Sequence, residues 1–317
     1  MKRSSLVAVL GVVLAALTTP AMAEWPDQPI RIVVPYPAGG GVDAMLRVLA
    51  PKMSQKLGQP VVVDNRAGAN ANLGPGIVGK AKPDGYTLLA SATYLVVNPL
   101  LETGLAWQPS QLQPVARLTL TPNLFVVNGN SPWKTLADFV AAARARPGLP
   151  IGNAGVGAPQ SMAQELLRIR AGVQFTDVPY RGSPPVMVDL ANDTVLMSVL
   201  PLAAAIGMLE GGKLRALAAA SEERSKLLPN VPTTTEAGYP DVIVVSWYGL
   251  HAPAGTPASV IKAIAEAAQV ATSDPDVQAK AATAGGETAF LNADDFAQLL
   301  ARDRQRWERT VAALKGR

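Results

Sequence analysis

The chain has 317 residues, of which 49% are hydrophobic and only 16% are charged. This length and composition can fill the cores of two domains and exclude disordered and fibrous proteins. The formal net charge is +4, half of it from Lys2 and Arg3, so no concentrated basic surface and no nucleic acid partner are expected. Cysteine is absent and histidine occurs once, which excludes disulfides, thiolate nucleophiles and multi-histidine metal sites.

The first 23 residues have the features of an export signal. Two basic residues precede an apolar run from Leu6 to Leu17, and residues 21–23 form an A-x-A cleavage pattern. The run has about 12 residues, whereas a membrane span needs about 20. We therefore expect a signal peptide cleaved after Ala23 and a soluble, exported, periplasmic protein. The alternative is a retained N-terminal anchor.

From residue 24 onward, short β-rich runs alternate with helical patterns, which is typical of βαβ units and an α/β fold. Strands are expected at Ile30–Pro35, Val61–Val63, Thr87–Ala90, Leu118–Val127, Phe175–Val178, Val195–Val199, Leu214–Ala220 and Val242–Tyr248. The clearer helices are expected at Val42–Leu57, Thr135–Arg146, Gln160–Ala171 and Pro184–Ala191. A last helix is expected after an N-cap at Asn292, with its apolar stripe at Phe296, Leu299, Leu300, Trp307, Val311 and Leu314.

Two segments of the chain share one plan of a strand, a glycine-rich turn and a helix. They are residues 32–43 and residues 150–159, and Pro159 stands where a first helical residue is expected. This repetition indicates equivalent loops in two lobes. The long β-rich passages near residues 117–128 and 242–250 are then natural crossovers between the lobes.

These crossovers divide the chain into a discontinuous first lobe and an inserted second lobe. We expect lobe 1 to comprise residues 24–122 and 246–317, and lobe 2 to comprise residues 123–245. Two hinge strands then join the lobes on either side of a ligand cleft.

Two sequence features resemble functional motifs but are expected to have only a structural role. Residues 74–79 match G-x-G-x-x-G, but nine residues separate them from the preceding strand, and Ala81 lacks the oxygen that a Walker A loop needs for magnesium. His251, which lies between a strand and a turn-rich junction, is expected to be a structural histidine near the hinge. The alternative is that its imidazole orients a ligand.

The first glycine-rich loop is a candidate anion site. Glycine permits positive φ angles, so Ala38, Gly39 and Gly40 can turn consecutive backbone N–H groups toward a carboxylate, and the following helix directs its N-terminus to the same place. Asp43, in the first turn, is expected to cap backbone donors and is also counted as a possible ligand contact. A tight strand-to-helix connection without a ligand is an equal alternative.

The second loop and two further segments offer polar groups from other directions. Two facing helix N-termini suit a dicarboxylate, and Arg181 can clamp a second carboxylate or form an exposed salt bridge. A third polar set follows the third expected strand and can contact the ligand; the alternative is that its side chains only cap the backbone of the loop. The residues concerned are Asn153, Gly155, Val156, Gly157 and Ser161 of the second loop, Tyr180, Arg181 and Gly182 after the next strand of that lobe, and the set Ser91, Thr93 and Asn98.

Six short motifs follow one another along nearly the whole chain beyond residue 24. They are PYPAGG at 35–40, DNRAGA at 64–69, PDGYTL at 83–88, PYRGS at 179–183, GKLRAL at 212–217 and WYGLHAPAGTP at 247–257. In this order they resemble the periplasmic solute-binding subunits of tripartite tricarboxylate transporters, the Bug family. The resemblance implies a two-lobed, type II (Venus flytrap) periplasmic binding protein that closes on a small carboxylate and passes it to two membrane subunits.

The resemblance also bears on the ligand. It implies that Ala38, Gly39 and Gly40 hold a carboxylate, partly through ordered water, and Tyr36 is counted with them. The chain departs from the family pattern at Ser161, where relatives often carry His, and at residues 192–195, where relatives commonly carry an Asp. Without that acid no partner for an ammonium group is expected, which favours a carboxylate with a less polar remainder over an amino acid.

We therefore expect a monomeric, non-catalytic receptor that needs no cofactor or metal. A signalling adaptor, whose closed form docks on a membrane sensor, is the alternative from a different class. An enzyme in the same cleft lacks a plausible nucleophile and base.

Overall fold

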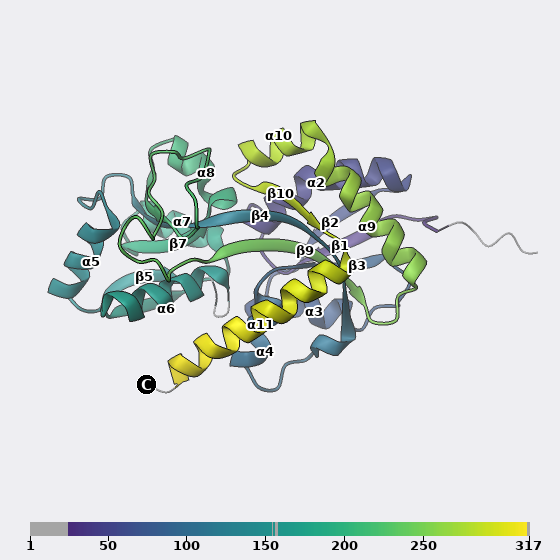
Figure 1. Cartoon of the computed structure of the whole chain (residues 1–317), viewed down its shortest axis with the longest axis horizontal. Coiled ribbons are helices and arrows are strands. Elements are labelled where there is room, and N and C mark those ends of the chain that lie inside the picture. Colours follow the sequence, from purple (N-terminus) through teal and green to yellow (C-terminus); the bar gives the residue numbers. More distant parts are fainter. Residues whose placement is uncertain (1–24, 154, 156–157, 316–317) are drawn as a thin grey trace, which may run out of the picture.

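The computed structural model describes residues 25–153, 155 and 158–315, so the expected signal peptide lies outside the described residues (Figure 1). Within these ranges no helix combines the length and apolar character that a membrane crossing requires. The strands are β1 Ile30–Val34, β2 Val61–Asn65, β3 Thr87–Ser91, β4 Leu112–Asn128, β5 Leu149–Asn153, β6 Phe175–Pro179, β7 Met197–Pro201, β8 Leu214–Ala219, β9 Val245–Pro253 and β10 Glu287–Leu291. The helices are α2 Gly41–Leu57, α3 Leu73–Val78, α4 Tyr94–Leu101, α5 Leu136–Ala145, α6 Pro159–Ala171, α7 Ser183–Ala191, α8 Leu202–Glu210, α9 Ala258–Ser273, α10 Pro275–Thr283 and α11 Ala293–Lys315, with short 3₁₀ turns η1 Ala69–Ala71 and η2 Pro109–Gln111.

One sheet is built from the two ends of the described chain. Its strand order is β2-β1-β3-β9-β4, in which β1, β2 and β3 are parallel and β9 is antiparallel to both of its neighbours. Strand β10 also pairs with β4. The apolar run of β1 is buried on both faces, as expected for a strand covered by helices on each side.

A second sheet is built from the middle of the chain. Its order is β6-β5-β7-β4, with β8 also on β4, and β5 is parallel to both β6 and β7. The sequence predicts a strand before the second glycine-rich turn, and β5 is that strand. Two buried apolar clusters lie in this part of the molecule, around Phe139 and around Leu200.

Strand β4 belongs to both sheets. It pairs with β9 from Leu112 to Pro122 and with β7 from Asn123 onward. The return crossing is at residues 244–245, because Val244 donates its N–H to Ala220 O in lobe 2 whereas Val245 pairs with Pro122. These two changes of partner support the proposed lobe boundaries at residues 122–123 and 245–246.

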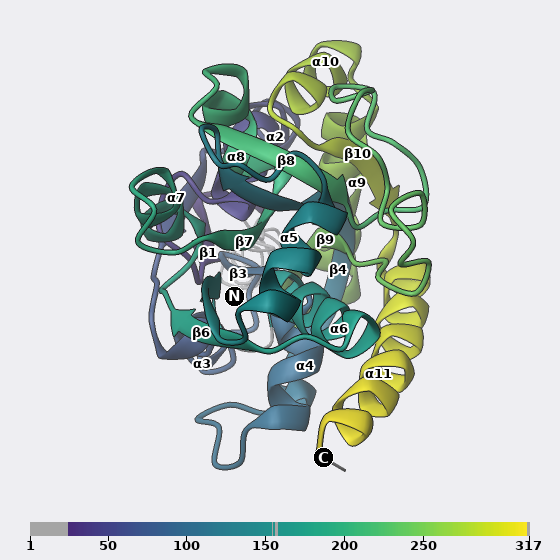
Figure 2. The same ribbon diagram turned by 90° about the vertical axis from the view of Figure 1, so that its left-hand side faces the viewer.

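The C-terminal helix α11 joins the two halves from outside. It begins at its predicted cap, where Asn292 Oδ1 accepts the N–H of Asp295 at 3.0 Å, and it runs beside α4 and β4 (Figure 2). Phe296 packs at 5.2 Å against Trp247 of β9, whereas Trp307 lies in the apolar cluster of lobe 2. The helix therefore contacts both lobes, although the sequence places all of residues 246–317 in lobe 1.

Candidate functional site

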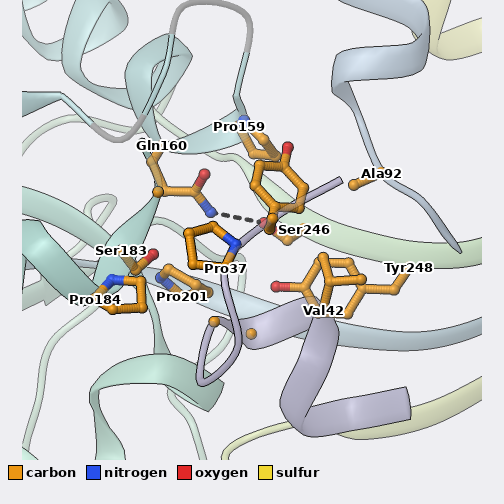
Figure 3. Close-up of a pocket in the computed structure, with 14 residues that line it drawn as sticks. Pro37, Val42, Ala92, Pro159, Gln160, Ser183, Pro184, Pro201, Ser246 and Tyr248 are labelled. Atoms are coloured by element: carbon orange, nitrogen blue, oxygen red, sulfur yellow. Dashed lines mark hydrogen bonds between the residues drawn. The ribbon is translucent and has the colours of Figure 1, made fainter. Parts of the chain in front are cut away.

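A small cavity lies where the two lobes face each other. Its volume is about 30 Å³, which is room for one or two water molecules. Lobe 1 lines it with Tyr36, Pro37, Gly40, Gly41, Val42, Ala92 and Tyr248, lobe 2 with Pro159, Gln160, Gly182, Ser183, Pro184 and Pro201, and the crossing segment with Ser246 (Figure 3).

Five helices begin at this cavity. The contributing residues are Gly41 and Val42 of α2, Ala92 two positions before α4, Pro159 and Gln160 of α6, Ser183 and Pro184 of α7, and Pro201 directly before α8. The first backbone N–H groups of a helix have no partner within it, and the helix dipole places partial positive charge there. The cavity is therefore surrounded by the positive ends of helices from both lobes.

The cavity holds no formal charge, because none of the described residues that line it is acidic, basic or a histidine. Its titratable groups are two tyrosines, and burial raises the pKa of both Tyr36 and Tyr248 far above the ordinary value. Both hydroxyls stay protonated at neutral pH and can donate hydrogen bonds. The cavity therefore presents neutral donors and helix dipoles, and no charged side chain of the described lining, to whatever occupies it.

A polar network at the crossing strands supports the floor of the cavity. Gln160 Nε2 donates to Ser246 Oγ at 3.3 Å (Figure 3). Gln160 Nε2 also donates to Asn123 Oδ1 at 2.7 Å, and Ser246 Oγ donates to Asn123 Oδ1 at 3.1 Å. Asn123 Nδ2 in turn donates to Val244 O at 2.6 Å. The network links the first turn of α6 to both strands that connect the lobes.

The first glycine-rich loop differs from the predicted arrangement of consecutive positive φ angles. Gly39 has φ +80°, but Gly40 is extended at φ −77°. The N–H of Gly39 is already used, because it donates to Asp43 Oδ2 at 2.9 Å. The part of this loop that lines the cavity is Gly40, Gly41 and Val42, with Tyr36 and Pro37 before it, whereas Ala38 and Gly39 do not line it.

Asp43 acts as the predicted cap for a backbone donor. Its carboxylate is buried, accepts from Gly39 and forms an ion pair with Arg47 at 3.0 Å. Burial opposes ionisation, but the hydrogen bonds from Arg47 and Gly39 outweigh it and lower the pKa of Asp43. The carboxylate thus holds the loop in shape and is not among the cavity-lining residues.

The side chains predicted in the second loop also hold backbone. Asn153 Oδ1 accepts from Gly155 N at 3.0 Å, and Ser161 Oγ donates to Gly155 O and Ala158 O, both at 2.8 Å. Neither residue lines the cavity. Val156 and Gly157 lie outside the described residues. As ligand contacts, these four residues stay predictions.

Of the segment after β6, Gly182 alone among the predicted residues reaches the cavity. Tyr180 directs its hydroxyl to Asp189 at 2.6 Å, and burial together with Asp189 raises the pKa of Tyr180 to about 12. Arg181 is exposed and does not line the cavity, and its guanidinium forms no ion pair with another described residue, so its role as a carboxylate clamp stays a prediction. Ser183 and Pro184, which follow directly, line the cavity instead.

The third predicted polar set lies behind the cavity wall. Ser91 Oγ is 2.8 Å from His251 Nδ1, and Asn98 Nδ2 donates to Asn70 O at 2.9 Å. Thr93 is buried at the N-cap of α4. Of this segment Ala92, between the two predicted hydroxyl residues, reaches the cavity. Asn98 donates to loop backbone, as the loop-capping alternative expects, whereas Ser91 pairs with His251 and the Thr93 side chain forms no capping hydrogen bond within the described chain. As ligand contacts, the three residues stay predictions.

His251 and the glycine-rich segment at residues 74–79, both expected to be structural, have structural roles in the described chain. His251 is buried beside Ser91 and Phe296, and burial lowers the pKa of its imidazole to about 3. Residues 73–78 form the short helix α3, and a Cβ on Gly74 would stand 2.9 Å from Pro35 Cβ, so this glycine allows close packing.

Several cavity residues were not predicted from the sequence. They are Gln160, Ser183, Ser246 and Tyr248, together with the prolines of the wall. Tyr248 lies in one of the six motifs, and Gln160 follows the predicted first helical residue, so both carried a positional signal. Ser246 carried no such signal, because it reaches the cavity through the tertiary contact between β9 and α6.

Comparison with known proteins agrees with this geometry. A family model described as the tripartite tricarboxylate transporter family receptor, TctC, matches residues 45–315. The chain belongs to this family. It is 34% identical to the protein BugT of Bordetella pertussis, over 98% of each chain. It is also 36% identical to a UPF0065 protein from the tcbD-tcbE intergenic region of Pseudomonas sp. strain P51, over 95% of this chain and 92% of that protein.

Solved structures of family members have the same fold. Rpa4515 of R. palustris, solved with adipate, aligns with a TM-score of 0.88 at 30% identity, covering 91% of this chain and 98% of that one. MatC of Rhodopseudomonas palustris, with bound malate, aligns with a TM-score of 0.85 at 31% identity, covering 90% of this chain and all of that one. The protein is therefore a TctC-family solute receptor with the two-lobed fold of periplasmic binding proteins, and the fold that the sequence motifs imply is confirmed.

Proposed function

We propose that the protein is an extracytoplasmic receptor that binds a small organic carboxylate and delivers it to a tripartite tricarboxylate transporter. The observation that carries this proposal is the uncharged cavity surrounded by helix N-termini from both lobes. Such a cavity favours an anion without requiring a basic side chain, and its described lining has no acidic side chain to pair with an ammonium group. The adipate and malate in related structures are both dicarboxylates, which agrees with this class of ligand.

The wall chemistry narrows the ligand further. Pro37, Val42, Pro159, Pro184 and Pro201 give the cavity apolar sides, whereas its polar groups are concentrated at helix starts and at the crossing strands. We therefore propose a carboxylate with a hydrocarbon body, closer to adipate than to a heavily hydroxylated acid. No catalysis is proposed, because no nucleophile and base are paired among the described cavity residues.

The small volume implies movement. Since the cavity is small, at about 30 Å³, ligand enters while the lobes are further apart and the cavity reshapes around it. We propose that this hinge motion occurs at the two crossings of β4 and β9. The protein acts as a monomer whose partners are the two membrane subunits of the transporter.

Gly40→Val tests the site. The backbone of Gly40 suits any residue, and a Cβ there would meet only Pro37 O at 3.4 Å, so valine fits the fold but fills part of the cavity. We expect unchanged circular dichroism and at least about tenfold weaker binding of a carboxylate by calorimetry. Gly76→Val, on α3 with open space around its Cβ, is the matched control and retains full affinity.

Native mass spectrometry of the protein purified from the periplasm identifies the ligand class directly. We expect a co-purified mass that matches a small carboxylate, and a chain mass that corresponds to cleavage after Ala23. Equal affinity of the Gly40→Val and Gly76→Val variants contradicts the placement of the site, and a co-purified amine or neutral sugar contradicts the ligand class.

A further inference from the structure

The turn at residues 68–72 has an unusual backbone. Ala69, Asn70 and Ala71 have consecutive positive φ angles of 47°, 53° and 67°. Residues with a Cβ rarely adopt this conformation even singly, because the Cβ crowds the backbone. In the described chain, only one further non-glycine residue, Asp193, has a positive φ. Such strain persists only where surrounding contacts enforce it, and it is often found at functional positions.

Neighbouring side chains of lobe 1 enforce this turn. Glu102 accepts hydrogen bonds from Asn70 Nδ2 at 2.8 Å and Asn72 Nδ2 at 2.9 Å. Asn72 Oδ1 accepts from Asn98 Nδ2 and from Trp107 Nε1, both at 3.0 Å. Every residue of this network belongs to lobe 1, so the turn keeps its shape whether the lobes are together or apart.

The strained turn reaches across to lobe 2. A Cβ built on Gly155 would stand 3.0 Å from Asn70 Oδ1, which places the amide of Asn70 directly against the second glycine-rich loop. Gly155 has φ +126° and no side chain, so the loop backbone can approach this closely. The contact joins residues 85 positions apart from opposite lobes, beside the cavity that α6 helps to form.

We propose that Asn70 is a latch that stabilises the closed form of the receptor. The network of Glu102, Asn72 and Asn98 presents its amide in advance, so closure gains the contact with Gly155 without ordering a new segment. Opening breaks the contact between Asn70 and Gly155. The latch rests on the proposed function, since it acts on the closure that traps the carboxylate, and it sets how long the ligand is held before release.

Three variants separate the amide from the backbone strain. Asn70→Gly removes both, Asn70→Ala removes the amide and keeps the strained Cβ, and Ala71→Gly relaxes the neighbouring strained position while keeping the amide. The two Asn70 variants share the loss of the amide, and with it both the contact with Gly155 and the hydrogen bond to Glu102. Ala71→Gly is the matched control, and we expect it to raise the melting temperature by about 2 °C through relief of strain.

Lobe separation can be measured without a known ligand. The chain has no cysteine, so Val62→Cys in lobe 1 and Val188→Cys in lobe 2, both at exposed side chains, accept a dye pair. In the ligand-free protein we expect both Asn70 variants to show a larger open population by single-molecule energy transfer, while Ala71→Gly matches the parent. With a bound carboxylate, both Asn70 variants should release it severalfold faster, because the closed form has lost the packing of the Asn70 side chain against Gly155.

The experiment distinguishes failure of the latch from failure of the proposed function. If the Asn70 variants match the parent, or if Ala71→Gly opens the lobes as they do, the amide is not a latch and the inference is overturned. If no carboxylate binds to any variant, the proposed function fails, but the ligand-free populations still decide on the latch.

Discussion

Gly182 meets two constraints at the same position. Its φ of +104° suits glycine alone, and a Cβ there would stand 3.1 Å from Pro37 Cδ of the other lobe. The residue is also the N-cap of α7 and lines the cavity. A side chain at residue 182 therefore opposes the approach of the two lobes.

Gly182→Ala is expected to weaken carboxylate binding by at least about tenfold, because closure must displace Pro37. The measurement is isothermal titration calorimetry. The control is Gly212→Ala, which has φ +67° but no atom within 4 Å of its Cβ. Both variants lose about 1 kcal/mol of stability from the backbone conformation, but only Gly182→Ala should lose affinity. Equal affinity in the two variants would contradict a closing contact at Gly182.

His251 makes the folding stability depend on pH. Its folded pKa of about 3 lies below the ordinary value of 6.5, so between these values the unfolded chain binds a proton that the folded protein does not. Stability therefore falls as the pH is lowered through this range, by about 2 kcal/mol between pH 7.5 and pH 5. Urea unfolding at both pH values measures it.

His251→Gln should remove most of this loss. The comparison with the parent isolates the imidazole from Asp303, whose buried carboxyl has a raised pKa and acts in the opposite sense. Should the variant and the parent lose the same stability on acidification, the imidazole is not the group responsible.

At the scale of elements, the crossing of β4 and β9 depends on Asn123. Its side chain is fully buried and makes hydrogen bonds to Gln160 of α6 and to Val244 and Ser246 of the crossing segment at β9. Removing the Asn123 amide leaves the buried polar atoms of these partners without their hydrogen bonds to it. A hydrogen-bonded amide at this position thus secures the place where the chain passes between lobes.

Asn123→Ala is expected to cost about 2 to 3 kcal/mol of unfolding free energy, as buried partners lose their hydrogen bonds. Denaturant unfolding with a constant m-value measures this loss. Asn130→Ala, at an exposed position whose side chain lies outside the crossing, should change stability by less than about 0.5 kcal/mol. A small, equal effect of both substitutions would mean that water replaces the Asn123 amide without cost.

The elements that could be predicted carry their own local signals. Strand β1 is a continuous apolar run, and α11 begins at a cap that is visible as Asn292 followed by acidic residues. Helix α8 was missed because its apolar residues show no helical period, and β10 because it is short and is ordered by its pairing with β4. Strand β9 runs past its predicted end at Tyr248 because its pairing with β4 continues to Pro253.

The candidate site was predicted by location better than by residue. Glycine and polar residues after strands indicated loops that contribute Gly40, Ala92 and Gly182 to the cavity, since these are the ends at which open α/β sheets bind ligands. The backbone-capping role expected of Asp43 is confirmed, whereas the sequence could not decide that Ser161 and Asn98 also direct their polar atoms to backbone in their own lobe. Which side chain of a loop faces a cavity is decided by how the two lobes pack together.

For the whole molecule, ligand binding and closure should appear as thermal stabilisation. At a hundredfold excess over Kd, a ligand that binds only the folded form adds about 2.7 kcal/mol, which should raise the melting temperature by roughly 5 °C. Because no charged side chain lines the described cavity, the shift should be nearly the same in dilute buffer and at physiological salt. A carboxylate screen by differential scanning fluorimetry measures both.

Arg181→Ala is the control for this experiment, because the exposed guanidinium is the nearest predicted basic group. We expect it to leave the thermal shift unchanged. A shift that collapses in sodium chloride, or that disappears in Arg181→Ala, means that surface charge holds the anion instead of the helix N-termini.

The position of β9 in its sheet determines the order in which the two lobes can fold. Strands β4 to β8 and their helices form one uninterrupted stretch, so the second lobe has its pairing partners as soon as residue 219 has been made. The first lobe must wait, because β9 lies between β3 and β4 in its sheet. During synthesis or threading across a membrane, the N-terminal third therefore stays without its central strand until residues 245–253 arrive. We expect chaperones that bind exposed apolar strands to act on this N-terminal third of the nascent protein.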